Sequence, residues 1–121
     1  MSYEFPDTER ALVEVLGETA TLWLPADFGN NLPMRHVYSV GGRDEGVLRT
    51  DRLVVDVYAV GRSAAKAGAE EVRSILTDGP HFTTEGLLDR ITVEVGPHLL
   101  PYASERIVRY TATYRVDVRP I

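Results

Sequence analysis

The residues of this sequence whose types could support chemistry are three histidines, His36, His81 and His98, and one carboxylate in an apolar segment, Asp56. A zinc site needs three or four converging ligands, and no two of the histidines lie three or four residues apart on a predicted helix. His81 and His98 each follow a Gly-Pro pair, which is typical of exposed loops. We therefore expect no metal site.

Catalysis by a histidine would need an orienting partner and a reacting group within reach. The sequence contains no Gly-x-Ser-x-Gly, His-Glu-x-x-His or glycine-rich phosphate loop, and Gly41-Gly42 lacks the following lysine of such a loop, so it indicates a turn. With no cysteine, the chain has no thiolate nucleophile and no disulfide. We expect neither enzymatic activity nor a cofactor.

Asp56 differs from the other carboxylates, because it lies inside the apolar run Val54-Val55-Asp56-Val57-Tyr58. If the face that it shares with Val54, Tyr58 and Val60 is covered, Asp56 needs a basic or hydrogen-bonding partner, since an unpaired buried carboxylate is unfavourable. We expect Asp56 to have a paired structural or intersubunit role.

Length and composition favour one folded domain, residues 1–121, because 121 residues are too few for two separate cores. The formal charge of -5 argues against a surface that binds nucleic acid by neutralising phosphates. Residues 1–6 lack the basic stretch and apolar run of a secretory signal, and apolar runs elsewhere are short. We therefore expect a cytosolic product that makes no membrane contact.

Two amphipathic helices are predicted to position these residues. The first is capped by Asp7 and ended by Gly17. The second follows Gly61, with Ser63 as its N-cap, and stops at Asp78-Gly79-Pro80. Its apolar positions recur with helical spacing at Ala65, Ala69, Val72 and Leu76. The residues at its start, Ala65, Gly68 and Ala69, are small and permit close approach to another backbone.

Four strands are predicted at residues 34–40, 53–60, 88–95 and 108–118, with a fifth, short strand near Trp23. The first should end at Gly41-Gly42, so that the polar linker forms a protruding hairpin tip at residues 42–49. Residues 96–104 are predicted to be a loop. The expected fold is α+β, with two layers: a mainly antiparallel four- to five-stranded sheet packed by two helices.

The last strand has the strictest pattern. Its even positions are apolar, from Val108 through Tyr110 and Tyr114 to Val118, and its odd positions are polar, which predicts one buried and one open face. Eleven residues span about 36 Å, twice the usual strand length, so part of the strand should extend beyond the core of its own domain. Another surface should cover that part.

Several short motifs occur in a particular order from Leu32 to the C-terminus. They are Leu32-Pro33, Val40-Gly41-Gly42, Thr50-Asp51, Val55-Asp56-Val57-Tyr58-Ala59, the alanine-rich helix from Arg62 to Leu76, Gly96-Pro97, Leu100-Pro101-Tyr102, and Arg109-Tyr110-Thr111-Ala112-Thr113. In this order the sequence resembles the tail terminator, or tail completion, proteins of long-tailed bacteriophages, especially those of actinobacterial hosts.

The resemblance implies a small α+β subunit that assembles into a six-membered ring on the tail tube, without catalysis. Such a ring ends tube polymerisation and joins the tail to the head. The implied partners are copies of the chain, the major tail tube protein and head-tail connector proteins, with DNA only as passing cargo in the lumen. The implied location is the neck end of the virion tail, after assembly in the host cytoplasm.

Physical reasoning places subunit contacts on the second helix and on the polar residues Asp56, Arg109, Arg115 and Arg119. The hairpin tip is expected to dock on the tube or a connector through Arg43, Asp44, Glu45 and Arg49. The segment 19–31, with the sole tryptophan, Trp23, matches no motif.

Two alternatives remain open. One is another head-tail connector or minor tail ring protein. The other is a small ligand-binding or enzymatic α+β domain that uses His81, His98 and Asp56 around a pocket.

Overall fold

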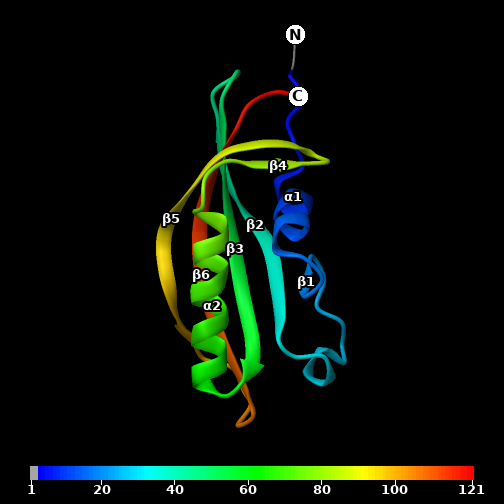
Figure 1. Cartoon of the computed structure of the whole chain (residues 1–121), viewed down its shortest axis with the longest axis vertical. Coiled ribbons are helices and arrows are strands. Elements are labelled where there is room, and N and C mark those ends of the chain that lie inside the picture. The colour runs from blue at the N-terminus through cyan, green and yellow to red at the C-terminus, as the bar shows by residue number, and fades with distance from the viewer. Residues whose placement is uncertain (1–2) are drawn as a thin grey trace.

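The computed structural model describes residues 3–121, which form two α-helices, a short 3-10 helix and one six-stranded sheet (Figure 1). The helices are α1 (Thr8–Leu16), η1 (Phe28–Asn30) and α2 (Arg62–Leu76). The strands are β1 (Ala20–Thr21), β2 (Met34–Asp44), β3 (Arg49–Val60), β4 (His81–Thr83), β5 (Gly86–Leu100) and β6 (Ile107–Val118).

The strand order in the sheet is β1-β2-β3-β6-β5-β4. The β1/β2 pair is parallel and every other pair is antiparallel, so the sheet is mixed. The sheet curls into a half-barrel, with α2 lying along its inner face (Figure 1). We call this the helix-covered face and the other one the outer face.

The helix ends follow the local sequence. The Asp7 side chain accepts a hydrogen bond from the backbone N–H of Arg10 at 3.2 Å, and α1 ends at Gly17, whose φ is 91°. The predicted N-cap of α2 is wrong, because the cap is Gly61 and Ser63 lies inside the helix. Gly61 has a φ of 84°, which favours glycine at this sharp strand-to-helix turn.

The core lies between the helices and the sheet. The buried apolar side predicted for β6 is confirmed, because Tyr110, Ala112, Tyr114, Val116 and Val118 are all at most 5% exposed. The expectation that part of this strand extends beyond the core is wrong, because β6 lies between β3 and β5 and is covered within the chain. Its polar side is only partly open, since Thr111 is also buried. The small face of α2 packs closely on β3, although against a side chain and not against backbone as predicted: a Cβ at Gly68 would lie 2.9 Å from Cγ1 of Val57.

The α+β class and the two helices are confirmed, but the expected four- to five-stranded, mainly antiparallel sheet is wrong. The sheet has six strands, because the three-residue strand β4 was missed and the short strand near Trp23 pairs in parallel with β2. Three residues are too few to show a two-residue period, so β4 leaves no recognisable pattern.

Two strands are longer than predicted. β2 continues through Gly41-Gly42 to Asp44 after a register shift between Ser39 and Gly42. Gly42 fits there because a Cβ would collide with the backbone carbonyl of Thr50. The hairpin turn is therefore residues 45–48, not 42–49. β5 likewise continues to Leu100 across the predicted loop, because register shifts interrupt its alternation without ending its pairing.

Both outer strands are only partly paired. β1 covers Arg35 and His36 of β2, and β4 covers residues 86–88 of β5. The outer edge of β5 is therefore unpaired along residues 89–100 within the part of the chain that the structure describes. The outer edge of β2 lies beside α1, where the Ser39 N–H donates to Glu9 Oε2 at 3.1 Å.

Candidate assembly surfaces

Asp56 lies at the centre of a buried polar network on the outer face. Its carboxylate is 1% exposed and accepts hydrogen bonds at Oδ2 from Arg109 Nη2 at 2.6 Å and Nε at 3.1 Å. The Tyr38 hydroxyl donates to the same oxygen at 3.2 Å. Three adjacent strands, β2, β3 and β6, therefore hold this network together, since Tyr38, Asp56 and Arg109 lie one on each.

Aromatic rings cover the network. The ring of Tyr58 is T-shaped against Phe28 of η1, at 5.0 Å between centroids, and against Tyr102 of the β5–β6 loop, at 5.6 Å. The guanidinium of Arg109 lies 5.7 Å from the centre of the Tyr58 ring. Two connecting segments, the β1–β2 connection that contains η1 and the β5–β6 loop, thus cover this part of the outer face, whereas α1 and α2 cover the other face.

The electrostatics of the network reflect this burial. Burial raises the pKa of Tyr58 to about 12 and also raises the pKa of Tyr38, and in both cases the nearby Asp56 charge adds to the effect. Burial alone would lower the pKa of Arg109, but its hydrogen bonds to Asp56 and the carboxylate charge outweigh burial and leave that pKa raised. Tyrosines 38 and 58 are therefore held neutral beside a charged pair.

The prediction that Asp56 is paired is confirmed, and its partner lies within the chain. Asp56 is too buried to reach a neighbouring subunit in this conformation, whereas the Arg109 side chain is 23% exposed. Arg115, further along β6, is exposed and has no ion-pair partner among the described residues. Arg119 pairs with Asp89 at 2.6 Å. A subunit contact at these residues stays a prediction.

The charged residues of the β2–β3 hairpin pair with one another. Arg43 Nε lies 2.9 Å from Glu45 Oε1, and Asp44 accepts the backbone N–H of Gly46 at 2.9 Å. Arg49 Nε lies 3.1 Å from Asp51 Oδ1. The predicted docking residues thus shape the hairpin, and their role in docking stays a prediction.

Sequence reasoning missed the apolar tip of this hairpin. Val47 is 61% exposed and Leu48 is 40% exposed, and both lie in the turn. The signal was present as two adjacent apolar residues inside an otherwise polar linker. Beside Leu48, a groove of about 430 Å³ runs along the outer face, with Arg52 and Arg115 among its lining residues.

Large apolar side chains are also exposed near both edges of the sheet. Trp23, just past β1, and Phe82, on β4, are each 83% exposed. The unpaired part of β5 adds Val93, Val95 and Leu99, which are 37–45% exposed. Trp23 lies in the segment for which the sequence offered no motif, and its only signal was a sole tryptophan among turn-forming residues.

A second groove, of about 370 Å³, lies where α1 is too short to continue the helical layer. Its floor is Val57 and Ala59, and one wall is the alanine-rich side of α2. Arg35 Nη2 and Glu71 Oε2, two of its lining residues, form an ion pair at 3.5 Å.

The three histidines make local contacts with backbone carbonyls. His36, His81 and His98 lie 2.8–3.0 Å from the carbonyl oxygens of Leu22, Leu76 and Gly96. His81 pairs opposite Leu88, and Leu88 and His98 pair with residues seven positions apart on β6, so the two histidines lie more than about 20 Å apart. The structure does not bring His81, His98 and Asp56 around one pocket.

Among the described residues, no group of three or more His, Cys, Asp or Glu side chains is arranged to hold a metal ion. None of the described helices is long and apolar enough to span a membrane.

No protein-family model matches this sequence, and a search of curated proteins found no significant match.

Proposed function

We propose that this chain is a structural subunit of a long-tailed bacteriophage, which assembles into a six-membered ring that caps the tail tube. The ring ends tube polymerisation and provides the surface that joins the tail to the head. The proposal starts from the ordered motifs between Leu32 and the C-terminus, which resemble those of tail terminator proteins. Its partners are copies of itself, the major tail tube protein and head-tail connector proteins.

The observation that carries the proposal is the uncovered surface at both edges of the sheet. The unpaired edge of β5 exposes Val93, Val95 and Leu99, and the opposite edge exposes Trp23. Unprotected strand edges and apolar patches favour association with another chain. A ring built head to tail covers both, because each subunit then offers two different surfaces to its two neighbours.

The β2–β3 hairpin supports a contact outside the ring plane. It projects past the helices at the end of the molecule where the C-terminus lies (Figure 1). Its exposed Val47 and Leu48 are an apolar tip flanked by the Arg43–Glu45 pair. Such a tip can insert into a partner as an anchor, with the charges setting its orientation.

The acidic balance of the chain fits the passage of DNA. A formal charge of -5 on each subunit gives the ring a net negative charge, which disfavours adhesion of the phosphate backbone as DNA passes.

The test is to add the purified chain to polymerising tail tube protein. Tube lengths are measured by negative-stain electron microscopy, and the mass of the added protein by native mass spectrometry. We expect shorter tubes with a density at one end, and a species of six 13.4 kDa subunits. Rings that leave tube length unchanged indicate a different neck or minor tail ring. A monomer with saturable small-molecule binding and no effect on tubes rejects the proposal.

A further inference from the structure

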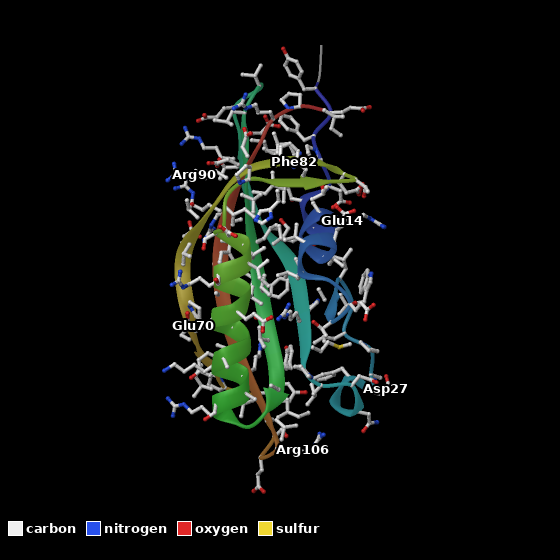
Figure 2. The ribbon with its side chains drawn as sticks, viewed as in Figure 1. Glu14, Asp27, Glu70, Phe82, Arg90 and Arg106 are labelled. Atoms are coloured by element: carbon white, nitrogen blue, oxygen red, sulfur yellow. The ribbon has the colours of Figure 1, made fainter. Side chains whose placement is uncertain are left out.

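The negative charge of this chain is concentrated at one edge of the sheet. Residues 1–33 contain six acidic residues and one basic residue, a net charge of -5, which equals the charge of the whole chain, so residues 34–121 are neutral in sum. The described part of this segment forms α1, β1 and η1, which lie together beside β2 (Figure 1). Figure 2 shows Glu14 and Asp27 on this side.

We define the acidic edge as Glu18, Trp23 and Asp27. Glu18 and Asp27 are exposed, and among the described residues neither forms an ion pair or a side-chain hydrogen bond. Both charges are therefore uncompensated within the subunit and available to a neighbour.

Trp23 is held in place although it is exposed. The Thr21 hydroxyl accepts the N–H of Trp23 at 3.1 Å and donates to its carbonyl oxygen at 2.8 Å, which fixes the turn after β1. With this backbone fixed, only the two side-chain torsions of Trp23 have to be ordered on binding, and tryptophan is enriched among residues that dominate interface energies. Trp23 therefore has the properties of an anchor on a preformed backbone turn.

The opposite flank, between α2 and β5, has uncompensated positive charge. Figure 2 shows Glu70 and Arg90 on this side. Three of its acids are paired with bases, as Arg73 lies 3.3 Å from Glu70, Arg119 2.6 Å from Asp89 and Arg52 2.7 Å from Glu94. A fourth acid, Asp78 in the exposed loop after α2, has no ion-pair partner among the described residues. Three exposed cations there have no ion-pair partner among the described residues. We define them as the basic flank: Arg62, Lys66 and Arg90.

The unpaired edge of β5 adjoins the basic flank and is unsuited to a regular intersubunit ladder. Its register shifts three times between Leu88 and His98, and Pro97 removes one backbone donor. Contacts along this edge must therefore come from side chains. The exposed ones include Val93 and Val95, which are apolar and follow Arg90 closely.

We propose that the subunit contact is made between opposite sides, with the acidic edge of one copy docked on the basic flank of the next and Trp23 packed against Val93 and Val95. This inference rests on the proposed ring and names the two halves of its interface. Two acidic edges repel each other, whereas an acidic edge attracts a basic flank, so the charges favour head-to-tail contact over a symmetric dimer.

The absence of cysteine from the sequence allows a direct test by cross-linking. One variant carries Ala26→Cys at the acidic edge, and another carries Val95→Cys on β5; a flexible bismaleimide is added to each alone and to their mixture. We expect no cross-linked product above background from either variant alone and a 1:1 dimer from the mixture. A variant with both cysteines should give a ladder that ends at the closed ring.

The outcomes separate this inference from the proposed function. Cross-linking within a single variant shows symmetric contacts and overturns the head-to-tail arrangement. No cross-linking in the mixture, together with capped tubes in the tube assay, overturns the interface but leaves the ring. No cross-linking and no capping overturn both.

Charge variants give a matched control. Lys66→Glu with Arg90→Glu should lower the dimer yield of the mixture about tenfold, and adding Glu18→Lys with Asp27→Lys to the other partner should restore it. Glu105→Lys, an exposed change on the β5–β6 loop, should leave the yield unchanged. Circular dichroism confirms that each variant is folded. Equal yields from all of these variants contradict the role of charge.

Discussion

From Leu53 to Ala59, both faces of β3 are buried, but by different means. On the helix-covered face, Leu53, Val55 and Val57 are at most 2% exposed and pack against apolar side chains. On the outer face, Asp56 and Tyr58 are 1% and 4% exposed and are covered by hydrogen bonds, aromatic rings and two connecting segments. The helix-covered face is therefore stabilised by close apolar packing, and the outer face by a few specific polar and aromatic contacts.

This difference explains why β3 shows no clean alternation. A strand with one open face alternates between apolar and polar residues, whereas a strand buried on both faces is almost continuously apolar. The single acid in such a strand has to be paired. The two faces should therefore respond differently to substitution.

The largest effect is expected from a charge on the helix-covered face. Tyr114→Asp places a carboxylate at a position that is 0% exposed, and we expect it to abolish folding, with a loss of more than about 4 kcal/mol. Arg115→Asp, the next residue on the exposed outer face, should change stability far less. Urea denaturation followed by circular dichroism measures both, and native stability of Tyr114→Asp would show that the core face is wrongly assigned.

A smaller but still severe effect is expected from the outer face. Arg109→Met leaves the buried Asp56 carboxylate without its main partner and should destabilise the fold by about 3–5 kcal/mol. Replacing both partners, with Asp56→Val and Arg109→Met, should recover most of that loss. A double-mutant cycle gives the coupling energy. Independent, additive effects of the two substitutions would mean that the pair does not hold this face.

Alkaline pH should weaken both faces. Tyr58 on the outer face has its pKa raised from 10.0 to about 12, and burial also raises the pKa of Tyr114 on the helix-covered face. Below pH 10 the folded and unfolded states are both protonated, so stability is full. As the pH rises from 10 to 12, the unfolded state releases protons that the folded state keeps, and stability falls.

The contribution of Tyr58, on the outer face, to this loss of stability can be measured separately from that of Tyr114. Tyr58→Phe should reduce the number of protons released on unfolding in this pH range by up to one. The slope of the unfolding free energy against pH should become shallower in proportion. Chemical denaturation at several pH values measures the slope. A wild-type slope in Tyr58→Phe would show that this phenol is not the group held neutral by burial.

The smallest effect on stability is expected outside both faces, at the hairpin. The Arg43 side chain is 81% exposed, so Arg43→Glu should change the free energy of unfolding by less than about 1 kcal/mol. If the hairpin docks on the tube or a connector, the variant should cap tubes or join heads poorly while remaining folded. Glu105→Lys, on the exposed β5–β6 loop, is a control for a charge reversal away from the hairpin. Normal capping and joining by Arg43→Glu would remove this residue from the docking surface.

Much of the fold follows from the sequence where one rule governs a whole element. The alternation of β6 identified its buried side chains correctly, and the apolar run around Asp56 predicted a paired acid. The arginine partner itself lies 53 residues away and is set by the register of β3 with β6, which local patterns do not encode.

The missed features share a physical origin. Register shifts interrupt the period in β2 and β5, and a three-residue strand is too short to have one. The uncovered edges were also missed, because exposure depends on which strands end the sheet. Trp23 and Val95 become recognisable as surface residues only once the strand order is known.

The position of β6 has a consequence for biosynthesis. Of the six strands, β6 is the last to leave the ribosome, yet it joins β3 to β5 at the centre of the sheet. Until β6 has been synthesised, the nascent chain therefore holds two separate half-sheets, each with an open inner edge. The two halves of the core can close on each other only after residues 107–118 have entered the sheet.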